Sequence, residues 1–244
     1  YYLIMYANKY KTHISGICTG VSQTILFNPV DRALYLHMIN NTKFINKANW
    51  LSPYQGMSNS IISRCISYGY YYTIIDTFNN YTDKYIDNKT TQHIATGILT
   101  GMTTSVLINP MNAIKYHSWG NNTRKLTKTM VNMYKNNGFK SFTRGLASTI
   151  KRDCTFSTIY TYAHPKIKQY NHNKPIKSFF TDLTMVACAT TLSSPFNYVR
   201  NQKYAVCYSQ QSPTMIKILR QLYYEANDVV GSFDRLKFYA RRLC

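Results

Sequence analysis

The chain is poor in acidic residues. Only nine Asp and Glu stand against 29 Lys and Arg, which gives a net charge of +20. No nucleophile–base pair, phosphate-binding glycine loop or metal-binding cluster stands out in the sequence, and the His residues are scattered. An enzyme is therefore disfavoured and no cofactor is expected. The excess of positive charge favours polyanionic partners, such as nucleic acid, anionic lipid headgroups or small molecules that carry phosphate.

Long apolar runs are also missing. The mean hydropathy of −0.31 is low for a membrane protein and, taken alone, favours a soluble basic protein. A transporter with a water-filled cavity also needs polar faces on its helices, so the value does not exclude a membrane protein. The six cysteines form no C-x-x-C pair and no zinc-like spacing with His. They are expected to be reduced thiols that bind no metal.

One motif centred on proline occurs three times at near-equal spacing. In each copy, an Asp or Asn follows the proline by two residues, and in two copies a cation follows it by five. The motif positions are Pro29, Asp31 and Leu34; Pro110, Asn112 and Lys115; and Pro195, Asn197, Arg200 and Gln202. A single match would be noise, but three copies in register indicate an internal repeat.

Small residues precede the first two motifs at matching positions. The pairs Gly16/Gly20 and Gly97/Gly101 have the small-x-x-x-small spacing that lets two helices approach closely. In the third copy the glycines are lost. These pairs predict close helix contacts in the first two repeats.

The pattern of apolar residues predicts long and short helices in alternation. Short amphipathic helices are expected at 126–138 and 214–227. Long segments near 10–38, 58–80, 93–119, 147–170 and 177–205 each reach the roughly 20 residues that a membrane span needs. The predicted fold is an all-α membrane protein, a threefold pseudo-symmetric bundle of transmembrane helices in one domain over 1–244. Its three repeats of long helix, short surface helix and long helix cover about 8–82, 90–170 and 175–244, with the sixth span truncated.

The threefold pattern P-x-[DE]-x-x-[KR]-x-[KRQ] resembles the signature of the mitochondrial carrier family, and the resemblance covers nearly the whole chain. The Asn-, Tyr- and Lys-rich composition and the degenerate motifs look most like the mitochondrial-carrier-like proteins of giant DNA viruses. This resemblance implies a monomeric, multi-pass antiporter in the mitochondrial inner membrane, of the host if viral, that works by alternating access. It also implies a nucleotide substrate, such as dATP or dTTP.

The resemblance implies that the proline motifs close the matrix side of a central cavity. If the repeats pair cyclically, as in the family, Asp31 and Lys115 form the one ionic bridge that is left. Asn112 would then make a charge–dipole contact with Arg200. The expected gate residues on this side are Pro29, Asp31, Pro110, Asn112, Lys115, Pro195, Asn197, Arg200 and Gln202. On the opposite side, Asp76 and Lys168 are the candidate gate pair.

Candidate substrate contacts lie mid-way along the even-numbered long segments. Arg suits bidentate binding of phosphate or carboxylate, and Tyr can stack on a base or a cation. The candidates are Arg64, Lys151, Arg152, Asp153, Arg242 and Tyr72. For each of them, an Arg at a lipid headgroup or a Tyr in an interfacial belt is the simpler interpretation. In the wider family an Arg followed by an acid often marks amino-acid substrates, so Arg152 and Asp153 keep an amino-acid carrier open as the alternative.

Two further partners are considered. Gly56 and Gly145 open helices whose free N–H groups can hold the phosphate of an anionic lipid, which matches the family's cardiolipin sites. A soluble, basic, helical nucleic-acid-binding protein is the other alternative, because the charge and the tyrosines fit it. That alternative leaves the threefold proline motif unexplained, so no nucleic-acid partner is expected.

Overall fold

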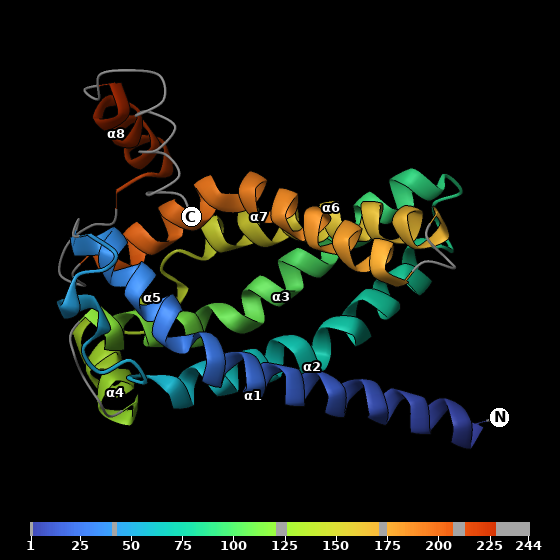
Figure 1. Cartoon of the computed structure of the whole chain (residues 1–244), viewed down its shortest axis with the longest axis horizontal. Coiled ribbons are helices and arrows are strands. Elements are labelled where there is room, and N and C mark those ends of the chain that lie inside the picture. Colours follow the sequence, from blue (N-terminus) through green and yellow to red (C-terminus); the bar gives the residue numbers. More distant parts are fainter. Residues whose placement is uncertain (1, 41–42, 121–125, 171–174, 207–212, 228–244) are drawn as a thin grey trace.

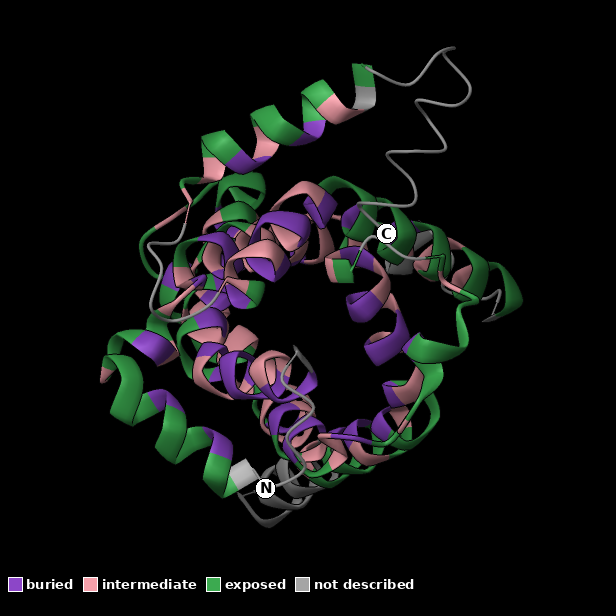
Figure 2. Ribbon diagram, turned by 90° about the vertical axis from the view of Figure 1, so that its left-hand side faces the viewer, coloured by how far each residue is buried: buried purple, intermediate pink, exposed green. Residues whose placement is uncertain are grey.

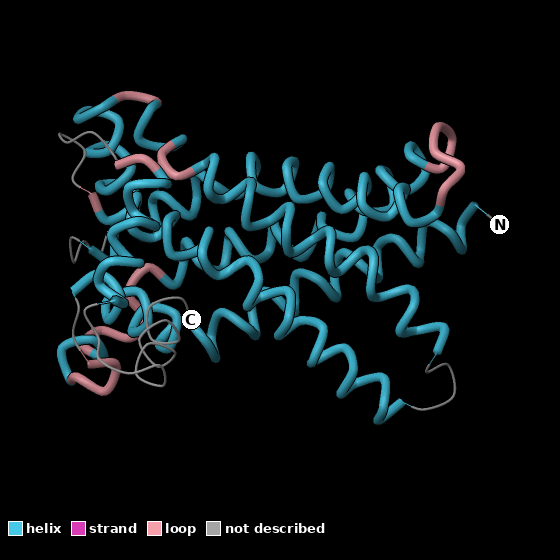
Figure 3. Tube along the Cα trace, turned by 90° about the horizontal axis from the view of Figure 1, so that it is seen from above, coloured by secondary structure: helices cyan, strands magenta, loops and turns pink. Residues whose placement is uncertain are grey.

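A computed structural model describes residues 2–40, 43–120, 126–170, 175–206 and 213–227. Every regular element in these ranges is a helix, as Figure 3 shows. The elements are α1 (Tyr2–Asn40), the 3-10 helix η1 (Lys47–Trp50), α2 (Met57–Thr82), α3 (Lys89–Gly120), α4 (Leu126–Asn137), α5 (Lys140–Thr143), α6 (Leu146–Tyr170), α7 (Pro175–Ala205) and α8 (Met215–Asn227).

The long helices form a bundle in which neighbours along the chain lie side by side. Helix α1 packs on α2, α2 on α3, α3 on α6, and α6 on α7. The short helices α4, α5 and α8 lie at one end of the bundle, and the N-terminus lies at the other (Figure 1). Each predicted long segment falls within one of these long helices, and α4 and α8 confirm the two predicted short helices. The predicted sixth span lies outside the described residues.

The three motif prolines all lie inside long helices, in α1, α3 and α7. A proline there cannot donate a backbone hydrogen bond, so the helix needs support from elsewhere. At Pro29 and Pro110 an Asn precedes the proline and reaches the segment that leads into the next long helix. Asn28 Nδ2 donates to the carbonyl of Pro53 at 2.9 Å, and Asn109 Nδ2 donates to the carbonyl of Phe142 at 2.7 Å. The two side chains thus tie α1 and α3 to the starts of α2 and α6.

Replacing Asn109 by alanine is expected to lower the free energy of unfolding by about 2–3 kcal/mol. Asn109 is buried, and its Oδ1 also accepts hydrogen bonds from Tyr204 Oη at 2.7 Å and from Thr149 Oγ1 at 3.0 Å, so the change removes these bonds together with the one to Phe142. Thermal unfolding of the purified protein measures the loss. Asn132→Ala on the exposed side of α4 is the control. Equal unfolding temperatures for the two variants would show that the Asn109 bonds contribute nothing.

The predicted close helix contacts are confirmed. A Cβ atom added to Gly97 would lie 2.5 Å from Thr158 Cα, and one added to Gly101 would lie 2.5 Å from the backbone N of Cys154. In the first repeat, a Cβ at Gly20 would meet the Arg64 backbone at 3.0 Å. Backbone therefore lies against backbone where α1 meets α2 and where α3 meets α6.

The burial pattern is inverted relative to a water-soluble bundle. On α3, Thr96 and Thr100 are fully buried, whereas Ile98, Met102 and Val106 are exposed. Elsewhere in the bundle, Ser105 and Thr149 are likewise buried, whereas Leu26 and Phe180 are exposed. Figure 2 views the bundle from one end, coloured by burial. Among the described residues, no helix combines the length and average hydropathy that mark an apolar membrane span.

The turn between α2 and α3 carries an exposed ion pair, in which Lys89 Nζ lies 2.7 Å from Asp83 Oδ1. The hydrogen bond and the charge of Lys89 hold the pKa of Asp83 below its usual value. The pair therefore stabilises the turn at neutral pH, and this contribution is lost as the pH falls through the lowered pKa.

Candidate functional site

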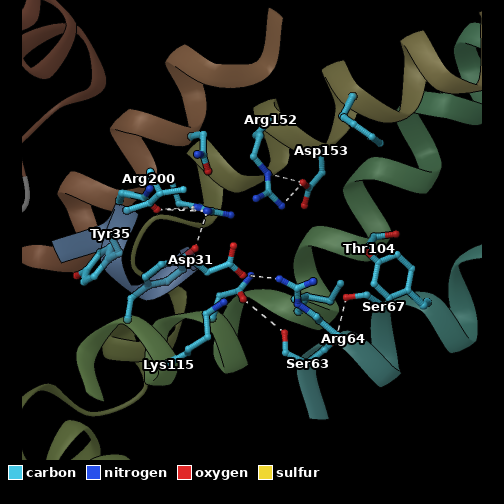
Figure 4. Close-up of a pocket in the computed structure, with 18 of the residues that line it drawn as sticks. Asp31, Tyr35, Ser63, Arg64, Ser67, Thr104, Lys115, Arg152, Asp153 and Arg200 are labelled. Atoms are coloured by element: carbon cyan, nitrogen blue, oxygen red, sulfur yellow. Dashed lines mark hydrogen bonds and ion pairs between the residues drawn. The ribbon is translucent and has the colours of Figure 1, made fainter. Parts of the chain in front are cut away.

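A cavity of about 450 Å³ lies between the long helices. All five long helices contribute charged side chains to its wall, and Figure 4 shows how these side chains face one another. The charged lining residues are Asp31 on α1, Arg64 on α2, Lys115 on α3, Arg152 and Asp153 on α6, and Arg200 on α7. Four cations and two carboxylates give the cavity a net positive charge.

Arg152 and Asp153 form an ion pair on the α6 side of the cavity. Arg152 Nε donates to Asp153 Oδ1 at 2.6 Å, and the two side chains are 27% and 12% exposed. Ser105 on α3 donates from its hydroxyl to the other carboxylate oxygen of Asp153, at 2.8 Å. The pair therefore presents a guanidinium and an oriented carboxylate next to each other in the cavity wall.

A second ion pair joins Arg64 and Asp31. The guanidinium of Arg64 also donates to Gln23 Oε1 at 3.0 Å, so the two side chains on α1 hold it from both sides. The sequence predicted a bridge between Asp31 and Lys115 instead. In this structure Arg64 takes the carboxylate, because α2 packs directly against α1.

Five of the nine predicted matrix-gate residues line the cavity where α1, α3 and α7 meet, a region called its deep end below. Asp31, Asn112, Lys115, Asn197 and Arg200 all line it. Asn112 Oδ1 accepts a weak hydrogen bond from Ser63 on α2, at 3.4 Å. Gln202 follows Arg200 by two residues on α7 and does not line the cavity. The structure thus brings five predicted gate residues together in one cavity, and their side-chain partners differ from those predicted.

Two predicted substrate contacts point away from the cavity. The Lys151 side chain is exposed, with its Nζ 3.8 Å from Met215 Sδ, and the exposed Tyr72 also lies outside the lining. Neighbouring residues on a helix point about 100° apart, and α6 is turned so that Arg152 and Asp153 line the cavity while Lys151 lies outside that face. On α2 the inward row is Arg64, Tyr68 and Tyr71, which share one helix face. This spacing was the signal for Tyr68 that the prediction missed.

The other candidates are less defined. Asp76 is exposed on α2. The side chain of Lys168 and the whole of Arg242 lie outside the described part of the chain. The opposite gate and the third substrate Arg therefore remain predictions. Within the described residues, no group of His, Cys, Asp and Glu side chains is arranged to hold a metal ion.

Gly56 and Gly145 occupy matching positions just before α2 and α6. Both have positive φ, at 72° and 78°, a conformation that favours glycine. A Cβ at Gly56 would lie 3.0 Å from Trp119 Nε1, and one at Gly145 would lie 3.1 Å from Tyr204 Cε1. A second cavity of about 410 Å³, lined by residues 52–59 and Ser118, lies at the start of α2. Lipid binding at these glycines remains a prediction.

Comparison with known proteins identifies similar sequences. The family of the mitochondrial carrier protein matches residues 87–175. The mitochondrial glycine transporter of Xenopus tropicalis is 24% identical, with 73% of this chain and 65% of the relative covered. The mitochondrial glycine transporter of Homo sapiens is 22% identical, with 73% and 64% covered. That of Yarrowia lipolytica is 21% identical, with 80% and 78% covered. The chain thus spans about 65% of the length of the first of these relatives.

Proposed function

The chain belongs to the mitochondrial carrier family, and from this premise we propose that it carries a small amino-acid-type substrate through its central cavity by alternating access. It acts as a multi-pass protein of the mitochondrial inner membrane. Proteins of this family are transporters and not enzymes, in line with the sequence prediction. The nucleic-acid-binding alternative gains no support from these relatives.

The pair of Arg152 and Asp153 is the observation that carries the substrate class. A free amino acid has a carboxylate and an ammonium group a few bonds apart. A guanidinium can bind the carboxylate through two parallel hydrogen bonds, and a carboxylate can accept hydrogen bonds from the ammonium group. Arg152 and Asp153 provide both groups side by side on α6, facing the cavity. The relatives named glycine transporters support the same class.

This proposal replaces the first interpretation of the sequence, which was exchange of nucleotides such as dATP and dTTP. The relatives are named for glycine and lend that interpretation no support. The relatives named above come from two animals and a fungus, so the closer resemblance to viral carriers also stays a prediction.

We further propose that the chain has the threefold architecture expected from its motifs. Matching contacts in the first two repeats support it. Cys65 Sγ lies 3.8 Å from the carbonyl of Ile17, and Cys154 Sγ lies 3.5 Å from that of Ile98. The inverted burial supports a lipid-facing outer surface, since exposed Ile, Met and Val side chains are stable in contact with lipid. We also propose that a cardiolipin-type lipid binds at Gly56 and Gly145, and that the protein is a monomer.

Uptake into liposomes tests the function. The full chain is purified, reconstituted and loaded with unlabelled substrate, and uptake of labelled glycine, basic amino acids, dATP and dTTP is compared with that of protein-free liposomes. We expect saturable uptake of an amino acid and none of the nucleotides. N-acetylglycine and glycine amide each lack one charged group of the zwitterion, so both should compete poorly with glycine.

Two outcomes would contradict the proposal. Uptake of nucleotides without amino acids would restore the nucleotide interpretation. Equal competition by glycine and N-acetylglycine would show that no carboxylate in the cavity binds the ammonium group, which would remove Asp153 from the site.

A further inference from the structure

The deep end of the cavity holds two cations that form no ion pair with a carboxylate of the described residues. Lys115 and Arg200 are 8% and 3% exposed, so both charges are largely removed from solvent. Both carboxylates of the cavity are engaged elsewhere, Asp31 with Arg64 and Asp153 with Arg152. None of the ion pairs found among the described residues includes either cation. A buried charge needs compensation, because its removal from water is costly.

Aromatic rings lie next to the two cations: Trp119 is 4.8 Å from Lys115 Nζ, and Tyr116 contacts both cations. The Nζ of Lys115 lies 4.8 Å from the ring centroid of Tyr116, and the Cζ of Arg200 lies 5.3 Å from the same centroid. Arg200 Nη2 also donates a hydrogen bond to the hydroxyl of Tyr116, at 3.0 Å. The ring face is negative in its charge distribution and attracts both cations, and the hydroxyl oxygen accepts from one of them.

The ring of Tyr116 is held in place by aromatic neighbours from three helices. It stacks on Tyr204 of α7 with centroids 5.1 Å apart and planes 15° apart. Tyr35 of α1 lies 4.7 Å away, and Trp119, one turn along α3, lies 5.3 Å away. Tyr116 therefore joins the three helices that carry the motif prolines, at the level of Lys115 and Arg200.

We propose that Tyr116 is a positioning residue that holds Lys115 and Arg200 at the deep end of the cavity through its ring face and hydroxyl. It substitutes for the carboxylates that Asn112 and Asn197 do not supply. The inference rests on the proposed transport function. In it, Tyr116 helps to close this end of the cavity by holding α1, α3 and α7 together. A neutral aromatic ring does not cancel the charges of Lys115 and Arg200, and these charges favour an anionic group in the substrate.

The proposal predicts that the protein loses thermal stability when Tyr116 is replaced. Tyr116→Leu should lower the unfolding temperature of the purified protein by about 4 °C or more, since roughly 1 kcal/mol corresponds to about 2–4 °C in a chain of this size. Tyr116→Phe keeps the ring face and loses the hydroxyl, so its unfolding temperature should fall between those of Tyr116→Leu and the wild type. Tyr134→Leu, at an exposed Tyr of α4, is the matched control and should leave the unfolding temperature unchanged.

The rescue variant adds Asn112→Asp to Tyr116→Leu. Asn112 lies one turn before Lys115 on α3, within reach for an (i, i+3) ion pair. The double variant should recover most of the lost unfolding temperature at about 0.05 M salt and less at about 0.5 M, because added salt screens an ionic pair that still has contact with water in the cavity. The difference between wild type and Tyr116→Leu should change little with salt.

Transport kinetics give a second readout. Tyr116→Leu should lower the maximal uptake rate more than it raises KM, because the change affects the closing of the cavity more than the contacts of Arg152 and Asp153 with the substrate. The inference is overturned if Tyr116→Leu unfolds at the temperature of Tyr134→Leu. It is also overturned if Asn112→Asp recovers nothing at low salt, since Tyr116 would then act by packing alone. If the variants show this salt and rescue pattern but the wild-type protein takes up no substrate, the proposed function is refuted and the role of Tyr116 stands.

Discussion

Replacing Arg152 by alanine is expected to reduce amino-acid uptake at least about 100-fold. The change removes the guanidinium that binds the substrate carboxylate, a charged interaction worth about 3 kcal/mol, and a difference of that size corresponds to about two orders of magnitude in rate. It also leaves Asp153 without its ionic partner Arg152 inside the cavity, although Ser105 still donates to it. Initial rates of uptake into liposomes measure the effect.

Two variants separate the role of the guanidinium from that of charge alone. Arg152→Lys keeps the positive charge but loses the two-pronged donor, so it should retain only a small part of the activity. Lys151→Ala removes the neighbouring charge, which points out of the cavity, and should transport like the wild type. Arg152→Ala uptake within about twofold of the wild type would remove Arg152 from the substrate site.

The long helices and their order could be predicted from sequence because their signals are local and repeated. Pro29, Pro110 and Pro195 recur in register, and the glycine pairs before the first two mark where helices touch. In each helix, residues at fixed spacing from the proline share a face, and Asp31 and Lys115 both line the cavity. A pattern that repeats along the chain needs no knowledge of distant contacts.

The direction of single side chains was harder to predict. Lys151 and Arg152 are adjacent and equally basic, and only the rotation of α6 decides which of them faces inward. Only the folded structure shows this rotation. Gly101 packs on the backbone of Asp153 and Cys154, so this part of α6 faces α3.

The partners of the charged groups could not be predicted at all. The motif fixes the spacing of Asp31 within α1 and of Lys115 within α3, but it does not say which side chain of another helix lies nearest. Arg64 lies on α2, directly beside Asp31, and its ion pair forms across that contact. Tyr116 was overlooked for a similar reason, since its partner Arg200 is far away in sequence and close only in the folded bundle.

The second large effect is expected at Gly101, where valine should destabilise the protein by about 3 kcal/mol or more. An added Cβ would lie 2.5 Å from the backbone N of Cys154 and 2.6 Å from its Cα. Backbone atoms inside a helix cannot move aside individually, so α3 and α6 would have to separate. The unfolding temperature of the purified protein should fall accordingly.

Gly69→Ala provides the matched control on α2. A Cβ there would lie 3.4 Å from Ile17 Cγ1, an ordinary contact with a side chain that can adjust, so alanine should be tolerated. Equal unfolding temperatures for Gly101→Val and Gly69→Ala would contradict the close packing of α3 on α6. The effect at Gly101 should also extend to transport. Arg152 and Asp153 sit on the part of α6 that Gly101 contacts, so helix separation would displace both charges and break the bond from Ser105 that orients the carboxylate.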